Sequence, residues 1–572
     1  MTLHTLAPGL FVSAQLQPAD IAALKLAGIR AIVCNRPDGE AAGQPGFGLI
    51  EQLARAHGIE AHYLPAPSGQ VGDEHGAAFG ALLATLPRPV LAYCRTGTRS
   101  ATMWALSQAS AQPPAALLDA ARRAGYDLAA LAPRLASHDV ARALADAPAS
   151  SHDVARTPAA APAGSHDVVI VGGGAAGIAT AASLLARWPG LDIAIIDPAD
   201  AHYYQPGWTM VGAGVFEAAS TARALGAVVP RGVRWIKAAV SAFEPERNAV
   251  IVEGGQAVGY RQLVVCPGLK LDWQAIEGLD EALGRDGVTS NYRYDLAPYT
   301  WRQVRQLRGG RAIFTQPPMP IKCAGAPQKA MYLSADHWKR QGVLGQIEID
   351  FCSAGAVLFG VADYVPALME YVNAYGIGLH FGDTLVAVDG PRKSATFKRT
   401  GADGAAQLIQ REFDLLHVVP PQVAPDFLRG GPLADAAGWV DVDPATLRHR
   451  RYDNVHALGD AANTSNAKTA AAARKQAPVV AHNVLAALGK AAGSARYDGY
   501  GSCPLTVERG KIVLAEFTYG GKLAPSFPSW LLDGTRPSRL AWLLKERILP
   551  PLYWRAMLKG REWMAAPSVV AP

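Results

Sequence analysis

Short apolar segments alternate with amphipathic ones along the first 110 residues of the chain. Residues 29–35, 60–66 and 88–94 have the continuous apolar pattern of buried strands. The stretches between them carry apolar residues at helical spacing. Because strands that alternate with helices form parallel sheets, we expect residues 1–136 to fold as one small α/β domain with a short helical tail.

Residues 137–164 break this pattern. The tetrapeptide Ser-His-Asp-Val begins at residues 137, 151 and 165, and its first two copies continue in Ala/Pro-rich sequence. Segments of this composition without apolar periodicity act as tethers between domains. We therefore expect a linker here.

From residue 165 the chain returns to alternating strands and helices, a pattern that predicts two Rossmann-like domains. Residues 165–300 and 441–500 form the first, and residues 301–440 form the second. Residues 501–572 differ in character and predict an amphipathic helical tail. The predicted fold class is thus α/β: a small N-terminal domain, a linker, two nucleotide domains of the glutathione-reductase type and the tail.

Composition and charge exclude several classes of protein. Half of the 572 residues are hydrophobic, and the net charge of +6 is spread without a dense Lys/Arg block, which argues against nucleic-acid binding. The six cysteines lack paired spacing, so we expect neither a disulfide framework nor a metal site. The chain has no run of about 20 apolar residues and no signal-peptide pattern, so we expect no membrane-spanning segment.

A glycine-rich loop between a predicted strand and a predicted helix indicates a dinucleotide site. Gly172 allows the tight turn, Gly174 lets the backbone approach a pyrophosphate, and Gly177 lets the helix pack on the sheet. Asp197, 20 residues beyond Gly177, ends the next strand, where its carboxylate can accept a hydrogen bond from a ribose. The expected ligands in the loop are Gly172, Gly174, Ala175, Ala176 and Gly177.

Two later segments favour FAD as the dinucleotide. Residues 260–268 predict a strand that ends at a Pro-Gly turn, and residues 451–477 predict a strand, a Gly-Asp pair and a helix. Asp460 can hydrogen-bond the ribityl chain, and the helix N-terminus that follows can stabilise negative charge on the reduced ring. The expected ligands here are Gly268, Gly459, Asp460, Lys468 and Thr469.

These segments resemble the sulfide:quinone oxidoreductases, together with HYYQPGWTMVGAGV at 202–215, IKCAGAPQKAMYLS at 321–334 and YDGYGSCPL at 497–505. The resemblance implies noncovalent FAD, oxidation of sulfide to a cysteine persulfide, electron delivery to ubiquinone and a small thiol as sulfur acceptor. It also implies peripheral, monotopic attachment to the cytoplasmic side of the inner membrane, and it leaves a homodimer open.

Cys323 is the expected redox cysteine. It follows Lys322 and precedes a predicted helix with Pro327 in its first turn, and both the cation and the helix N-terminus favour a thiolate. A thiolate released when hydrosulfide attacks an enzyme-held disulfide can pass electrons to a flavin. The segment lacks a second glycine-rich loop, which argues against a nicotinamide site.

The sequence offers several candidates for the second redox cysteine. The family usually carries one directly after the Gly-Asp pair, where this chain has Ala461. Cys352, which ends the strand beside the one leading to Cys323, is the first candidate to replace it, and Cys266 is another. Cys503 matches a family cysteine that we expect to be structural. A further alternative is a mechanism in which Cys323 acts alone and passes sulfur to a soluble acceptor.

Residues 536–563 combine seven Lys/Arg with three Trp and several Leu, and contain two Glu. Two amphipathic helices broken at Pro550-Pro551 would place aromatic and aliphatic side chains on one face, as in helices that lie in a bilayer interface. An ordinary helical hairpin packed on the body or on another subunit is the alternative. A lipid substrate such as quinone favours the membrane interpretation.

The N-terminal domain carries a second candidate cysteine. Cys94 follows a strand and precedes a helix, so backbone N–H groups can cradle an anion that Arg99 clamps. Four residues separate Cys94 from Arg99, as in the rhodanese loop, whereas cysteine phosphatases have five. The domain resembles the phosphatase-like domain fused to metallo-β-lactamase-like sulfur dioxygenases. We expect sulfur transfer, with phosphatase activity or a non-catalytic anion-binding module as alternatives.

Two rival functions remain open for the flavoprotein part. A type II NADH:quinone dehydrogenase would need the second glycine-rich loop that the sequence lacks. A non-catalytic flavin-bearing membrane sensor would show slow turnover or none.

Overall fold

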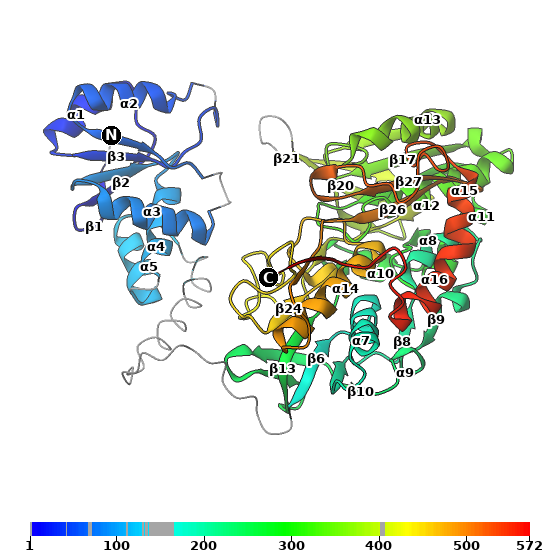
Figure 1. Cartoon of the computed structure of the whole chain (residues 1–572). Helices are drawn as coiled ribbons and strands as arrows, with labels where there is room; N and C mark the ends of the chain where they lie inside the picture. The colour runs from blue at the N-terminus through cyan, green and yellow to red at the C-terminus, as the bar shows by residue number, and fades with distance from the viewer. Residues whose placement is uncertain are drawn as a thin grey trace. The chain divides into compact units, whose positions relative to one another are not determined.

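The computed structural model describes residues 3–41, 43–66, 71–109, 112–128, 131, 135, 165–400 and 406–571. The chain divides into two units, Met1–Thr157 and Pro158–Pro572, and each is described by itself (Figure 1). The predicted linker, residues 137–164, lies outside the described residues. Both units combine helices with sheets whose central strands are parallel, so the predicted α/β class is confirmed.

The first unit is built on a five-stranded sheet in the order β1-β2-β5-β3-β4. Successive side chains of a strand point to opposite faces, so Val33 packs with α3, α4 and α5, whereas Ile32 packs with α1 and α2. The strands are β1 (His4–Ala7), β2 (Leu10–Ser13), β3 (Ala31–Cys34), β4 (Glu60–Tyr63) and β5 (Val90–Tyr93), and the helices are α1 (Ile21–Leu26), α2 (Phe47–Ala56), α3 (Asp73–Thr85), α4 (Thr98–Gln108) and α5 (Pro114–Arg123).

The second unit contains two larger sheets. The first has the order β10-β7-β6-β13-β12-β11, with β24 paired to β13, and helices α7 and α14 pack in its core. Its elements are β6 (His166–Val171), α7 (Ala175–Arg187), β7 (Ile193–Ile196), β10 (Val233–Ile236), β11 (Val240–Glu244), β12 (Ala249–Val252), β13 (Ala257–Val265), β24 (Val455–Ala457) and α14 (Ala470–Ala487). The chain therefore leaves this sheet after β13 and returns to it at β24.

The other large sheet is parallel and has the order β15-β22-β16-β17-β18. Helices α12 and α13 cover one face, and the small sheet β19-β20-β21 packs on the other. Its elements are β15 (Val288–Thr289), α11 (Ala297–Gln306), β16 (Gly310–Gln316), α12 (Ala326–Arg340), β17 (Ile347–Ser353), α13 (Val365–Tyr375), β18 (Ile377–Phe381), β19 (Asp383–Asp389), β20 (Ser394–Thr400), β21 (Ala406–Glu412) and β22 (Leu415–His417). β15 joins this sheet although it precedes residue 300, the predicted boundary.

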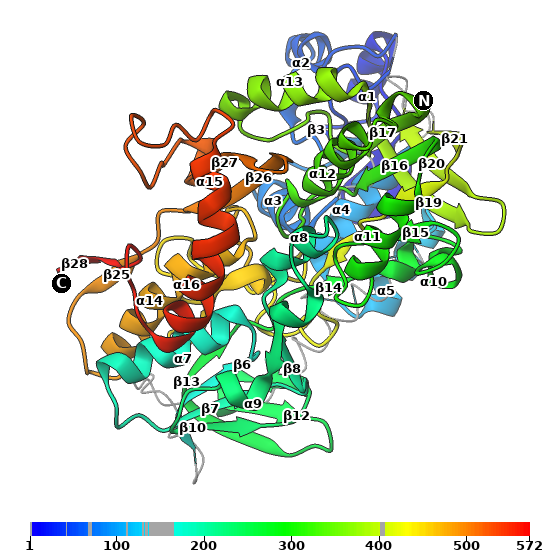
Figure 2. The same ribbon diagram turned by 90° about the vertical axis from the view of Figure 1, so that its right-hand side faces the viewer.

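The C-terminal segment begins with strands rather than helices. β26 (Gly501–Glu508) and β27 (Lys511–Phe517) form an antiparallel hairpin that packs against α12. α15 (Arg539–Leu543), a π-helical turn (Leu544–Ile548) and α16 (Leu549–Arg555) then run as one continuous helix (Figure 2). The predicted break at Pro550-Pro551 is wrong, because the helix continues through both prolines, directly after a π-helical turn in which the Leu549 N–H donates to the Leu544 carbonyl oxygen.

Candidate functional site

The glycine-rich loop lies between β6 and α7, as the sequence predicts. Gly172 has φ +107°, and a Cβ there would lie 2.4 Å from the carbonyl oxygen of Cys266. A Cβ on Gly177 would lie 1.9 Å from the oxygen of Gly172, so both positions require glycine. Space beside Gly174 is open, since a Cβ there would meet no atom within 4 Å. A ligand backbone can therefore approach the loop at Gly174.

A cavity of about 460 Å³ begins at this loop and extends through the second unit. It brings together nearly all of the predicted cofactor ligands with Cys323. The predicted residues that line it are Gly172, Gly174, Ala175, Ala176, Asp197, Gly268, Cys323, Gly459, Asp460, Lys468 and Thr469. The open space at Gly174 and the phosphate-binding geometry at the start of α7 fit FAD.

Asp197 and Asp460 mark two points along the cavity. Asp197 accepts a hydrogen bond from the Gly173 N–H at 2.6 Å, so its carboxylate is fixed against the loop. Burial raises the pKa of Asp460, and the positive charges of Lys468 and Lys322 oppose that rise. Thr469 caps the N-terminus of α14 by accepting from the Ala472 N–H at 3.2 Å. The N-terminus of α14 therefore borders the cavity beside Asp460.

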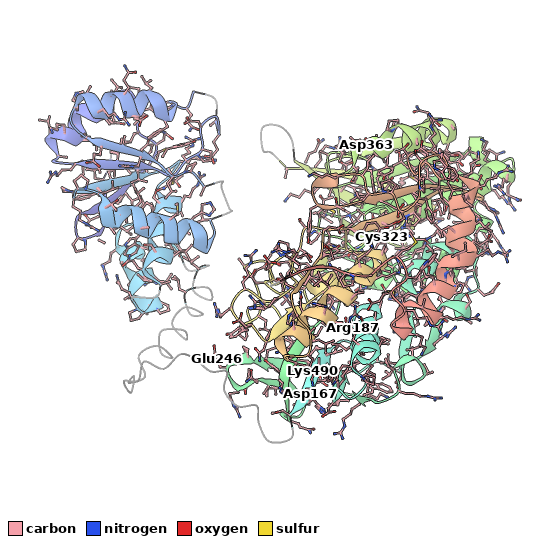
Figure 3. All side chains as sticks on the ribbon, viewed as in Figure 1. Asp167, Arg187, Glu246, Cys323, Asp363 and Lys490 are labelled. Atoms are coloured by element: carbon pink, nitrogen blue, oxygen red, sulfur yellow. The ribbon has the colours of Figure 1, made fainter. Side chains whose placement is uncertain are left out.

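Cys323 lies next to a thiol that the sequence did not assign to it. Its Sγ is 3.4 Å from Sγ of Cys503, and Lys329 Nζ donates to Cys323 Sγ at 3.2 Å. Cys323 sits between β16 and α12, within the body of the second unit (Figure 3), and has φ +81°. Cys503 comes from β26, 180 residues further along the chain. The structure therefore forms a pair of thiols beside an ammonium group.

Gly325 permits this close approach. A Cβ at Gly325 would lie 2.3 Å from Cδ2 of Leu505 and 2.7 Å from Sγ of Cys503. Only a residue without a side chain lets the loop after Cys323 rest on β26 at this distance. The Cys-Ala-Gly segment at 323–325 therefore packs directly against β26, the strand that carries Cys503.

The two thiols have opposite pKa shifts. The hydrogen bond with Cys503 and the charge of Lys329 lower the pKa of Cys323, against the effect of burial. The same hydrogen bond, together with burial, raises the pKa of Cys503. These shifts favour Cys323 as the thiolate of the pair and Cys503 as the thiol that donates to it.

Lys545, on the π-helical turn, is a second buried cation near the thiols. Burial and repulsion from Lys329 lower the pKa of its ammonium group to about 7, while the charges of Cys323 and Cys503 oppose that shift. Its Nζ lies 3.4 Å from the carbonyl oxygen of Pro206, and the residue lines the cavity. The sequence analysis missed Lys329 and Lys545 because both occur in helical segments where Lys is common.

The expectation that the Cys352 thiol approaches Cys323 is wrong. Cys352 lies on β17 with its side chain in the core under β19 and β20, whereas the neighbouring Phe351 packs with α12. Successive residues of a strand face opposite sides, so Cys352 points away from the helix that follows Cys323. Burial raises its pKa to about 12. Cys266 packs under the glycine-rich loop, with Sγ 3.7 Å from the Gly172 oxygen.

The first unit holds Cys94 in a loop between β5 and α4. The Gly97 N–H donates to Sγ of Cys94 at 3.2 Å. Arg99 is buried and donates to Glu40 at 2.8 Å and to the Asn35 carbonyl oxygen at 3.1 Å. The structure therefore brings Cys94 to a backbone N–H but holds the Arg99 guanidinium on protein oxygens.

Two buried hydroxyl groups near this loop lack a protein partner among the described residues. They are Oγ of Ser100, which follows Arg99, and Oη of Tyr126. A Cβ on Gly97, whose φ is +94°, would lie 2.1 Å from Oη of Tyr126. The Tyr126 hydroxyl thus sits directly against the loop that carries Cys94.

Within the described ranges, no group of three His, Cys, Asp or Glu side chains has a geometry that could hold a metal ion. Among the helices that the structure describes, none is both long and apolar enough to cross a bilayer.

Residues 166–300 match the pyridine nucleotide-disulphide oxidoreductase family, and residues 2–111 match the phosphatase-like domain of beta-lactamase hydrolase-like proteins. The chain is 39% identical over 407 residues to the mitochondrial sulfide:quinone oxidoreductase of Dictyostelium discoideum, covering 71% of this chain and 88% of that protein. Its N-terminal part is 33% identical over 100 residues to the beta-lactamase hydrolase-like protein of Agrobacterium fabrum, covering 18% of this chain and 23% of that protein.

Among solved structures, the sulfide:quinone oxidoreductase of Aquifex aeolicus superposes with a TM-score of 0.57 at 18% identity. The match covers 69% of this chain and 92% of that one, and it supports the fold of the second unit.

Proposed function

Because the chain belongs to the sulfide:quinone oxidoreductase family, we propose that Cys323 and Cys503 are its sulfide-oxidising pair. It is an FAD-dependent oxidoreductase, and the family membership favours sulfide oxidation over the NADH dehydrogenase and sensor alternatives. The observation that carries the assignment of the pair is the 3.4 Å distance between the two sulfur atoms in the cavity that begins at the FAD loop.

The opposite pKa shifts of the two thiols set the direction of the reaction. Starting from a Cys323–Cys503 disulfide, hydrosulfide attacks the Cys503 sulfur, the disulfide bond breaks and Cys323 leaves as a thiolate. The thiol with the lower pKa is the better leaving group, and Lys329 stabilises its negative charge. The attacking sulfur keeps its proton and remains on Cys503 as a persulfide.

A small thiolate then removes the outer sulfur of the Cys503 persulfide, and Cys503 is left as a thiolate. Loss of two electrons from the two thiolates forms the disulfide again. FAD, when bound along the cavity, accepts these two electrons and passes them to a quinone. In the proposal, Gly172, Gly174, Ala175 and Ala176 hold its pyrophosphate, and Asp197 and Asp460 hold its ribose and ribityl groups.

Two measurements test the pair. Anaerobic sulfide should bleach the flavin absorbance of the yellow protein, and NADH should not. Peptide mass mapping of the quinone-oxidised protein under nonreducing conditions should find residues 323 and 503 in one linked peptide pair. A linked pair that contains Cys352 or Cys266, or thiols that all alkylate freely in the oxidised protein, would refute the assignment.

The C-terminal part supports peripheral attachment to a membrane, which we place on the cytoplasmic side of the inner membrane. Large apolar side chains stand exposed beside several Arg residues, the pattern of a surface that enters a bilayer interface. These side chains are Trp530, Leu531, Leu540, Leu543, Ile548 and Trp563. Flotation with anionic liposomes should carry the protein upward, and Trp530→Ser with Leu543→Ser should abolish this. Recovery of the intact protein only at the bottom of the gradient would exclude the membrane site.

The first unit supports a second activity, transfer of sulfane sulfur by Cys94. The Gly97 N–H donates to its sulfur, and two buried hydroxyls beside the loop, those of Ser100 and Tyr126, have no protein partner among the described residues. Arg99 is held by Glu40 rather than free to clamp a phosphate monoester. A thiosulfate:cyanide assay should show activity that Cys94→Ala removes. Hydrolysis of a phosphotyrosine analogue, lost in the same variant, would instead identify a phosphatase.

A further inference from the structure

The hairpin of β26 and β27 has one face in the core and one face on the cavity. Side chains alternate along each strand, so one face carries Cys503 toward Cys323 and α12. The opposite face pairs Ser502 with Glu516 and Pro504 with Leu514. The residues of this second face that line the cavity are Ser502, Pro504, Leu514 and Glu516.

Glu516 is the one carboxylate on this second face, and it is 5% exposed. Its Oε1 accepts hydrogen bonds from the Tyr500 hydroxyl and from the Ser526 hydroxyl, each at 2.5 Å. Its Oε2 accepts from the Ser526 N–H at 3.1 Å. Burial of a carboxylate is costly, and these three donors offset that cost. All three residues line the cavity.

The surroundings of this cluster suit a flat apolar ring with polar oxygens. Phe527, Leu544 and Ile548 line the same cavity, and Ile548 is also exposed at the surface proposed to meet the membrane. A quinone head can therefore enter along apolar side chains and meet hydroxyl groups and a carboxylate at depth.

Two members of the cluster, Tyr500 and Ser526, are only half-buried. The backbone N–H of Tyr500 donates to the exposed Asp498 at 3.0 Å. Nζ of Lys475 lies 5.4 Å above the Tyr500 ring. A proton taken up at this surface can pass along the Tyr500 hydroxyl to Oε1 of Glu516 through the hydrogen bond already formed.

We propose that Glu516, held in place by Tyr500 and Ser526, takes up a proton, donates a hydrogen bond to a carbonyl oxygen of the quinone and delivers one of the two protons that quinone reduction requires. The inference rests on the proposed function, because sulfide supplies the two electrons through the flavin. The Glu516 carboxylate takes a proton from solvent through Tyr500, gives it to the quinone oxygen as that oxygen gains electron density, and returns to the carboxylate form.

Glu516→Gln changes only the side chain, so it keeps the backbone contact in which the carbonyl oxygen of residue 516 accepts from the Ala524 N–H at 3.0 Å. The holoenzyme is reduced chemically with stoichiometric dithionite and then mixed either with decylubiquinone or with ferricyanide, which takes electrons without protons. Dithionite makes the result independent of the sulfide step, so failure of the sulfide assignment remains a separate outcome.

In Glu516→Gln, we expect reoxidation by decylubiquinone to slow by roughly 10²-fold, the usual effect of losing a general acid. Reoxidation by ferricyanide should stay unchanged. Glu508→Gln is the matched control and should leave both rates unchanged, because Glu508 lies on the neighbouring strand β26, is ion-paired with Lys511 and does not line the cavity. Equal slowing with both oxidants, or no slowing with decylubiquinone, would overturn the proposal.

Two further variants, Tyr500→Phe and Ser526→Ala, keep the Glu516 carboxylate. They test the same proposal if the Glu516→Gln protein does not fold. Each removes one hydrogen bond that positions the Glu516 carboxyl group, so each should weaken decylubiquinone binding by roughly fivefold, followed by tryptophan fluorescence quenching. Tyr500→Phe should also lower the solvent isotope effect on quinone-dependent reoxidation. Unchanged binding together with an unchanged isotope effect would count against the relay.

Discussion

Cys94 and Cys323 each follow a strand of a parallel sheet and precede a helix, yet their neighbours differ. Cys323 has a second thiol at 3.4 Å and an ammonium group at 3.2 Å. Cys94 has a backbone N–H at 3.2 Å, and the nearby Arg99 is tied to Glu40. A thiol pair can give up two electrons by forming a disulfide, whereas a single thiol beside a backbone N–H can only carry a group. The same local motif therefore supports two chemistries.

The largest effect should come from breaking the pair itself. Cys503→Ser removes the sulfur that hydrosulfide attacks, so sulfide-dependent flavin bleaching should fall by roughly 10³-fold or more. Cys352→Ser is the matched control, because Cys352 lies in the core beyond the sheet and should leave bleaching within about twofold. Stopped-flow absorbance of both variants decides the point. Loss of bleaching in Cys352→Ser with retention in Cys503→Ser would reverse the assignment.

Removing the ammonium group should have the next largest effect. In Lys329→Gln, Cys323 loses a charged hydrogen-bond donor, so its pKa should rise and bleaching at neutral pH should slow by roughly 10- to 100-fold. The thiolate form is the active one, so the acid limb of the pH–rate profile should move to higher pH. Lys339→Gln, at the exposed end of the same helix, is the control. A lower rate with an unshifted acid limb would mean that Lys329 has only a packing role.

On the other side of the comparison, Gly97→Ala should disrupt the Cys94 loop. The new Cβ would lie 2.1 Å from the Tyr126 hydroxyl at a φ of +94°, so the Gly97 N–H should leave the Cys94 sulfur. Thiosulfate:cyanide activity should fall by roughly tenfold, and sulfide-dependent bleaching should stay unchanged. Gly48→Ala, in α2 where a Cβ meets nothing within 4 Å, should preserve both activities. Equal loss of both activities in Gly97→Ala would show that the two sites are not independent.

The contrast also explains what the sequence could predict. The FAD loop, Asp197 and the Cys94 loop are local motifs, so their residues were found from spacing alone. Cys503 was missed because its contact with Cys323 joins segments 180 residues apart. Cys352 was chosen because its strand does lie beside β16, but the alternation of side chains turns it to the other face. Ala461, where a second redox cysteine was sought, packs in the core of the FAD-binding sheet. The sequence therefore predicts which strands are neighbours in the sheet. It does not predict on which face of the sheet a cysteine lies, or which residue far along the chain contacts it.

The smallest expected effect concerns Lys545 and varies with pH. The pKa of Lys545 is about 7, so its ammonium group is charged below that pH. This charge adds to that of Lys329 in stabilising the Cys323 thiolate, and it is lost as the pH rises above about 7. The wild-type bleaching rate should exceed that of Lys545→Met by roughly threefold near pH 6, and the ratio should approach one near pH 8. Taking the ratio at each pH cancels the ionisation of sulfide itself. Lys559→Met, exposed in the same tail, should show a ratio of one throughout. A constant ratio above one for Lys545→Met would indicate that the residue acts through packing of the π-helical turn, so that the charge around the pair comes from Lys329.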